Sequence, residues 1–99
     1  MRSVRRTSGE ITDEEELGYS PTAVGVDFRD DFMYVHLQDG RYVTVPITAY
    51  WRLCEATQEQ RAAVEISPRG ISLHWEEIDE DLSVSGLVRD FGASGGGFA

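Results

Sequence analysis

Histidine and carboxylate side chains are the groups in this 99-residue sequence that could do acid–base or metal chemistry. His74 is followed closely by an acidic run, and Asp79 and Asp81 of that run are the best candidates for sharing a cation with it. Hard divalent cations prefer such oxygen ligands. However, the run lacks the glycine and the alternating ligands of a calcium loop, and no cluster of His and Cys indicates zinc. We therefore expect no metal or other cofactor, with Asp79 and Asp81 capping the following turn and His74 on the polar side of a strand.

Cys54 is the only cysteine, so it has no partner for an internal disulfide. A nucleophilic cysteine needs a lowered pKa and a nearby base. Because Cys54 follows Tyr50 and Leu53 at helical spacing, we interpret it as a small core residue. The sequence shows no P-loop, no glycine-rich dinucleotide turn and no Ser-His-Asp spacing. We therefore predict that the protein is not an enzyme.

The net charge of −9 comes from 18 acidic residues against nine arginines, and the chain has no lysine and no asparagine. A GC-rich genome would explain both missing residue types, and a saline host would favour an acidic, lysine-poor surface; composition does not separate the two. Binding to nucleic-acid phosphates needs a basic face, so we expect no direct contact with nucleic acid. The chain has neither an apolar stretch of about 20 residues nor an apolar segment behind its basic start, so we expect no membrane span, no secretory signal and a cytoplasmic location.

Period-two alternation predicts strands over residues 23–28, 32–37 and 42–45. Asp39-Gly40 between the last two strands favours a two-residue type I′ turn. That turn pairs Leu37 with Tyr42 and separates the side chains of the hairpin into two faces. One face then carries Met33, Val35, Leu37 and Tyr42, and the other carries Phe32, Tyr34, His36, Val43 and Val45.

Both predicted faces of the hairpin are rich in apolar or aromatic side chains, so the second face needs a cover. The rest of the chain, a second subunit or a foreign partner would each supply one. Arg41 and Arg52 are bidentate donors suited to a carboxylate on this chain or on a partner. We therefore predict an interaction surface made of Phe32, Tyr34, His36, Arg41, Val43, Val45 and Arg52.

Three further elements have helical signals. Thr48 is a plausible N-cap for a helix ending at Ala56, and the Thr57–Gln60 capping-box pattern predicts a second helix through about residue 64. Ser83 is a plausible cap for a last helix containing Val84, Leu87, Val88 and Phe91. Alternation over residues 71–75 predicts a fourth strand.

These elements predict an α+β fold, with a three-stranded antiparallel meander and a fourth strand packed against two or three short helices. Residues 21–91 form the single domain. We expect residues 1–20 to be a flexible charged arm, in which Thr12 and Glu15 fit a capping box, and residues 92–99 to be a flexible Gly-rich tail.

A group of short stretches resembles one known family over about residues 22–88. The stretches are Asp39-Gly40-Arg41-Tyr42-Val43-Thr44-Val45-Pro46, Arg52-Leu53, Ala56-Thr57, Glu59-Gln60-Arg61, Gly70, His74-Trp75, Ile78-Asp79-Glu80-Asp81-Leu82-Ser83-Val84 and Gly86-Leu87. In their order and spacing they resemble the short bacterial proteins called domain of unknown function 2442. That family usually has proline where this chain has Trp51 and Glu76, which puts local element boundaries in doubt there.

The resemblance implies a compact α+β domain, sometimes fused to a helix-turn-helix domain and often encoded beside another small protein. That arrangement looks like a toxin–antitoxin or regulatory pair. We therefore expect a non-catalytic interaction module whose partner is another protein, such as a neighbouring gene product, or a second copy of the chain. Two alternatives stay open: an acidic inhibitor that mimics nucleic acid, and a metal-dependent enzyme built on His74, Asp79 and Asp81.

Overall fold

The structure, a computed structural model, describes residues 21–95. Its elements are β1 (Ala23–Arg29), β2 (Phe32–Leu37), β3 (Arg41–Pro46), the 3-10 turn η1 (Ile47–Ala49), α2 (Trp51–Glu55), α3 (Gln58–Ala62), β4 (Glu65–Ile66), β5 (Ser72–Trp75), β6 (Glu80–Ser83), α4 (Val84–Phe91) and β7 (Ser94–Gly95). The strands form two sheets in the orders β1-β2-β3-β7 and β4-β5-β6. The predicted α+β class and the antiparallel meander β1-β2-β3 are confirmed.

Two predicted segments reach beyond the described residues. The charged arm over residues 1–20, with its capping box at Thr12, lies wholly outside them. Of the Gly-rich tail, residues 92–95 are described, and Ser94 and Gly95 pair with Tyr42 and Arg41 at the edge of β3.

The loop between β2 and β3 has three residues, so the predicted two-residue type I′ turn is wrong. Val35 lies opposite Val43 and Met33 opposite Val45. The amide of Gly40 donates to the carbonyl of Leu37 (3.1 Å), and Gly40 alone in this loop has a positive φ, of 93°. A turn followed by a left-handed glycine is the usual three-residue hairpin connection.

This one-residue change in register moves β3 to the opposite face. Val43 and Val45 are fully buried (0% exposed), so their place in the predicted interaction surface is wrong. Tyr42 moves outward and is 36% exposed. Because side chains alternate along a strand, a single shift exchanges the whole set of inward and outward residues.

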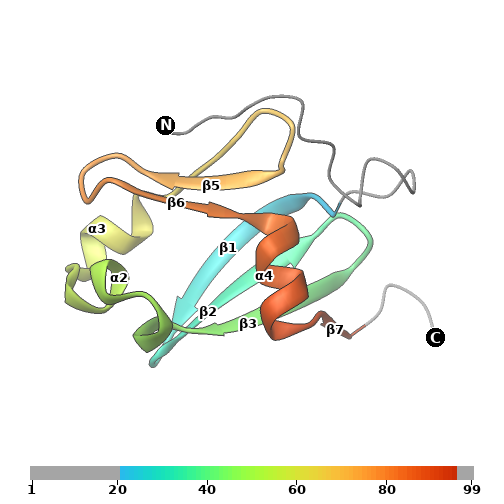
Figure 1. Cartoon of the computed structure of the whole chain (residues 1–99), viewed down its shortest axis with the longest axis horizontal. Helices are drawn as coiled ribbons and strands as arrows, with labels where there is room; N and C mark the ends of the chain where they lie inside the picture. Colours follow the sequence, from blue (N-terminus) through green and yellow to red (C-terminus); the bar gives the residue numbers. More distant parts are fainter. Residues whose placement is uncertain (1–20, 96–99) are drawn as a thin grey trace.

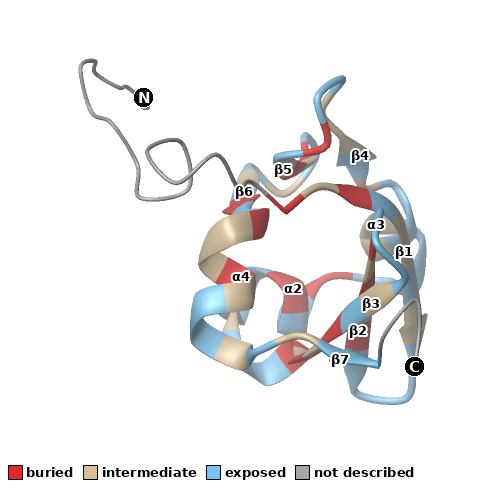
Figure 2. Cartoon of the chain, turned by 90° about the vertical axis from the view of Figure 1, so that its right-hand side faces the viewer, coloured by how far each residue is buried: buried red, intermediate tan, exposed pale blue. Residues whose placement is uncertain are grey.

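The core lies between the inner face of the first sheet and a layer made of α4 and the second sheet (Figures 1 and 2). Val84 and Leu87 of α4 are buried, as are Leu73 and Trp75 of β5. The indole N–H of Trp75 donates to the carbonyl of Arg61 (3.0 Å), which satisfies the only polar atom of that buried ring.

The predictions for the middle helices are mixed. The Thr57–Gln60 capping box at the start of α3 is confirmed, with both side chain–backbone bonds present. The prediction of Thr48 as an N-cap is wrong, because Thr48 lies within η1 and α2 starts after Tyr50 without a side-chain cap. Cys54 is exposed rather than a core residue. Leu53, which is 0% exposed, is the residue of α2 that packs into the core.

The acidic run after Trp75 forms the turn and second strand of a hairpin, β5–β6, which the sequence pattern did not predict. Its pairs include His74 with Asp81 and Trp75 with Glu80. Ser83 at the end of β6 accepts a hydrogen bond from the amide of Gly86 (3.2 Å), so its predicted role as the cap of α4 is confirmed. Among residues 21–95, no helix is long and apolar enough to cross a membrane.

Candidate interaction surface

One face of the first sheet, here called the outer face, points away from α4 and the second sheet (Figure 2). Three rows of paired residues cross it, and Tyr34 lies in the middle row of the middle strand. The rows are Gly25–His36–Tyr42, Asp27–Tyr34–Thr44 and Arg29–Phe32–Pro46. No helix or strand of the described residues lies over them.

Aromatic rings form a continuous chain across the outer face. The ring centroid of Tyr34 lies 6.5 Å from that of Phe32 and 6.4 Å from that of Tyr42, and Tyr42 lies 6.5 Å from His36. The guanidinium of Arg29 lies 4.7 Å from the centre of the Tyr34 ring. Phe32 and Tyr42 are 39% and 36% exposed, so the chain of rings still presents apolar area to solvent.

A polar pair borders this chain on the β1 side. His36 Nε2 lies 2.9 Å from Asp27 Oδ2, across neighbouring strands. Both side chains are well exposed, so the pair contributes little to stability and serves better to orient the imidazole beside Tyr42.

The structure brings together only part of the predicted interaction surface. Phe32, Tyr34 and His36 share the outer face, and Arg41 lies at the end of the hairpin, where its Nε donates to Asp39 Oδ2 (2.8 Å). The amide of Arg41, which also donates to Asp39, lowers the pKa of that carboxyl. Arg52 lies on α2, where it donates to the carbonyl of Asp79 (2.9 Å).

Tyr42 is the functional candidate that sequence reasoning placed on the wrong side. The predicted two-residue turn pairs it with Leu37, on the face that carries Met33 and Val35. The three-residue loop ending at Gly40 puts it on the outer face against Tyr34 and His36. An Asp-Gly pair is compatible with both loop lengths, and the apolar character of Val43 and Val45 was the signal that could have separated them.

The weak metal candidates assemble only as a pair. His74 Nδ1 lies 2.5 Å from Asp81 Oδ1, and the hydrogen bond to Asp81 is the main cause that raises the pKa of His74 above its ordinary value of 6.5. Asp79 does not join them, and no group of three or more possible ligand side chains gathers within residues 21–95. Because Asp81 bonds His74 and Ser83 caps α4, the expectation that Asp79 and Asp81 cap the following turn is wrong.

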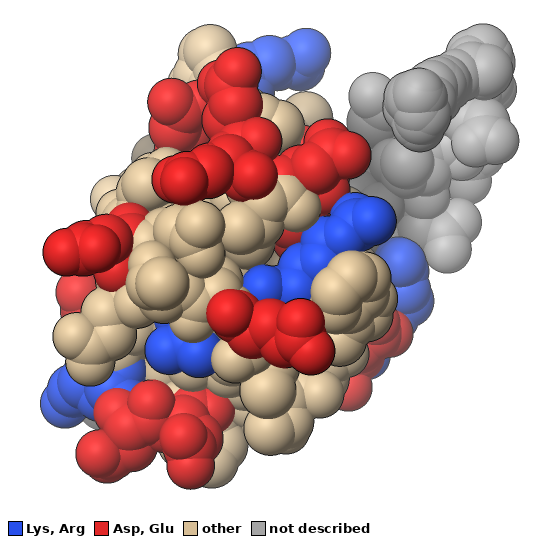
Figure 3. Space-filling model, turned by 90° about the vertical axis from the view of Figure 1, so that its left-hand side faces the viewer, with Lys and Arg blue, Asp and Glu red and all other residues tan. Residues whose placement is uncertain are grey.

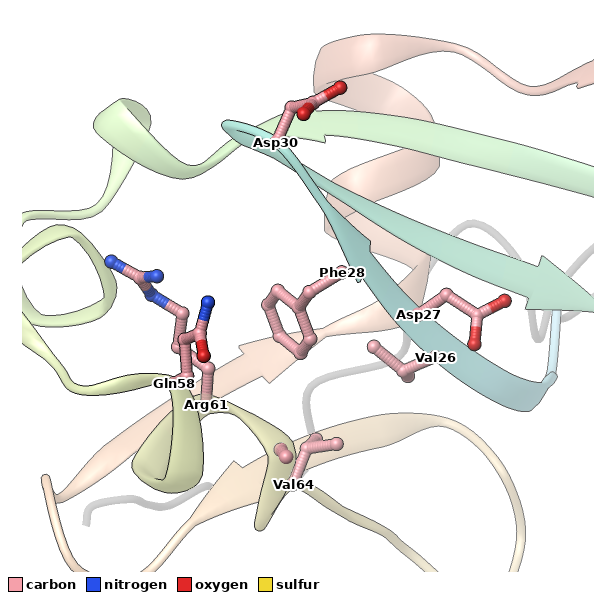
Figure 4. Close-up of a pocket in the computed structure, with 8 residues that line it drawn as sticks. Val26, Asp27, Phe28, Asp30, Gln58, Arg61 and Val64 are labelled. Atoms are coloured by element: carbon pink, nitrogen blue, oxygen red, sulfur yellow. The ribbon is translucent and has the colours of Figure 1, made fainter.

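A hollow of about 460 Å³ lies between β1 and α3 (Figure 4). The ring of Phe28 points into it, with Val64 on the opposite wall. The guanidinium of Arg61 holds the end of α2, because it donates hydrogen bonds to the carbonyls of Leu53 (2.7 Å) and Cys54 (3.0 Å). The residues that line this hollow include two carboxylates, Asp27 and Asp30, and no cysteine, serine or histidine.

The described residues thus define a small α+β protein with an aromatic sheet face that no described helix or strand covers. The family model described as "Protein of unknown function (DUF2442)" matches residues 23–93, and the chain belongs to this family.

Two solved structures are similar to the chain. A protein of unknown function from Rhodospirillum rubrum is 31% identical, with 76% of this chain and 93% of that chain covered and a TM-score of 0.64. An uncharacterized protein from Chromobacterium violaceum is 24% identical, covers 87% of this chain and 85% of its own, and has a TM-score of 0.63, which supports the fold alone. No curated protein matches the chain.

Proposed function

We propose that the protein is a non-catalytic interaction module that binds another protein through its outer face. The observation that carries this proposal is the uncovered chain of rings from Phe32 through Tyr34 and Tyr42 to His36. Aromatic side chains are enriched at protein interfaces, because they bury a large area with few rotatable bonds. A sheet face with Tyr34 at its centre suits a partner that covers the whole face.

The proposed role is that of the regulatory or antitoxin-like member of a two-gene system in the cytoplasm. Its partner would be the product of a neighbouring gene, with self-association as the competing use of the same face. The resemblance to a family often encoded beside a second small protein supports the two-gene arrangement. Imitation of nucleic acid fits this face poorly, because Asp27 is the only carboxylate among its nine positions.

The test replaces Tyr34 with glutamate and measures binding to the neighbouring gene product by pull-down and calorimetry. Size-exclusion chromatography with light scattering gives the oligomeric state. Tyr34→Glu should weaken binding or self-association by about tenfold or more, because it puts a charge in the centre of the covered area. Ile71→Glu is the matched control, since Ile71 is 42% exposed, like Phe32, but lies outside the outer face.

The proposal fails if Tyr34→Glu remains folded by circular dichroism and keeps both its binding and its assembly state. It fails equally if Ile71→Glu causes the same loss, because the effect would then be one of net charge.

A further inference from the structure

We propose a second docking site, separate from the outer face, for a basic, extended segment of a partner protein. The site is a hollow of about 200 Å³, here called the Trp51 hollow. It is lined by Trp51, Arg52, Glu55, Ala56, Gln60 and Ile78, from α2, α3 and the β5–β6 turn.

Trp51 is the exposed anchor of this hollow. It is 65% exposed, whereas the other tryptophan, Trp75, is 1% exposed in the core. The guanidinium of Arg52 lies 5.2 Å from the centre of the Trp51 ring, so the protein already uses this indole as a platform for a cation. Tryptophan is one of the residues enriched at binding hot spots.

The walls of the hollow are fixed by polar contacts across its base. Arg52 joins α2 to the β5–β6 turn, with Nη1 2.9 Å from the carbonyl of Asp79 and 3.5 Å from Glu80 Oε1. Gln60 of α3 donates to Glu77 of the same turn (3.3 Å). A site formed before binding loses less conformational entropy when it is occupied.

The surroundings of the Trp51 hollow are acidic. Figure 3 shows carboxylates, with arginines between them, around an uncharged surface on this side of the molecule. The two arginines of the three elements, Arg52 and Arg61, both donate to main-chain carbonyls. The carboxylates of the same elements are Glu55, Glu59, Glu76, Glu77 and Asp79. The resulting negative potential attracts a basic segment and repels nucleic acid.

The chemistry of the occupant follows from this arrangement. An arginine or lysine of the partner lays its aliphatic stem along the exposed part of the Trp51 ring and brings its charge to Glu55, one helical turn away. An apolar neighbour in the same segment packs against Ala56 and Ile78. Neither contact involves the outer face, so this site and the proposed function can fail separately.

The test uses the full chain and a fluorescein-labelled peptide of about nine residues that alternates arginine with leucine, the Arg–Leu peptide. Two matched peptides serve as comparisons. The Glu–Leu peptide replaces all arginines by glutamate, and the Arg–Ser peptide replaces all leucines by serine. Binding is read from anisotropy, and Trp51 burial is read with the unlabelled peptide from a blue shift of tryptophan emission, to which buried Trp75 contributes little. The Arg–Leu peptide should bind and shift the emission, and raising the salt from about 50 to 300 mM should weaken it about tenfold. The Arg–Ser peptide should bind more weakly, and the Glu–Leu peptide should not bind.

Trp51→Ala should lower the affinity for the Arg–Leu peptide about tenfold or more, with folding unchanged because the side chain is exposed. Glu55→Gln should lower it about threefold and reduce the salt dependence. Ile71→Ser is the control, because Ile71 is exposed and lies outside both the hollow and the outer face, and this variant should bind the peptide as the unmodified chain does.

Four results would overturn the proposal. The first is equal affinity of the Trp51→Ala variant, and the second is equal binding of the Glu–Leu peptide. The third is binding at least about tenfold tighter after Arg2, Arg5 and Arg6 are all changed to serine, which would assign the hollow to the chain's own amino-terminal residues. The fourth is a blue shift that grows with protein concentration alone, which would assign it to a second copy.

Discussion

Arg52 Nη1 lies 3.5 Å from Glu80 Oε1, so two residues that are 28 positions apart in the sequence connect α2 to the strand β6. The Glu80 side chain is only 15% exposed, and burial is the main cause that raises the pKa of its carboxyl. Arg52 offsets part of that burial cost with its charge and also satisfies the carbonyl of Asp79, a residue with a positive φ of 55°.

Replacement of Arg52 by methionine should therefore destabilise the fold. It leaves a partly buried carboxyl without its cation and a carbonyl without its donor, and we expect the free energy of unfolding to fall by about 1–3 kcal/mol. Urea denaturation followed by circular dichroism gives the value. Arg69→Met, at an exposed loop position, should change stability by less than about 0.5 kcal/mol. Equal effects of the two changes would show that the Arg52–Glu80 contact is not stabilising.

The His74–Asp81 pair predicts a pH dependence with a definite sign. The pKa of His74 is raised in the folded protein, so the folded state binds this proton more tightly than the unfolded state does. The contribution of the pair to stability is then fully present below the ordinary pKa of 6.5 and is lost as pH rises through the raised value. The melting temperature should fall more between about pH 6 and 8 in the unmodified protein than in His74→Gln.

Asp81→Asn provides the control for that measurement, because it removes the main cause of the shift and keeps the imidazole. An NMR titration of His74 should give a lower pKa in this variant. A His74 pKa that does not move would mean that the 2.5 Å contact is not formed in solution.

The register of β3 predicts opposite effects for two adjacent residues. Val43→Asp should prevent folding, because an unpaired charge at a fully buried position costs several kcal/mol. Tyr42→Asp should leave a folded protein, because Tyr42 lies on the outer face. Circular dichroism and the dispersion of amide NMR signals distinguish the outcomes, and a two-residue Asp39-Gly40 turn would require the reverse pattern.

A side chain at Gly70 should clash with the backbone of Ala23, which lies against it. Gly70 has a positive φ of 74°, its carbonyl accepts from the amide of Ala23 (2.7 Å), and a Cβ at this position would lie 3.0 Å from the Ala23 oxygen. Gly70→Ala should cost about 1–3 kcal/mol in thermal or urea unfolding. Gly25→Ala is the control, because the nearest atom to its new Cβ, on His36, is 4.0 Å away. A neutral Gly70→Ala would contradict the described position of this loop.

Local chemistry determined much of the secondary structure of this protein. The strands over residues 23–28 and 32–37 follow from alternation, and the caps at Thr57 and Ser83 follow from hydrogen bonds that span only three residues. Such signals act between neighbours in the chain, so they do not depend on what packs around them.

Only the tertiary structure decided which side chains of the hairpin are exposed and which are buried. Asp39-Gly40 allows two loop lengths, and the longer one places both Val43 and Val45 in the core, where each buried aliphatic side chain stabilises the fold by about 1.5–3 kcal/mol. The acidic run formed a strand because Leu82 could pack beside Leu73, a contact between residues on paired strands. The candidate surface and the Trp51 hollow both depend on such distant contacts, and for that reason sequence reasoning found some of their residues but not their grouping.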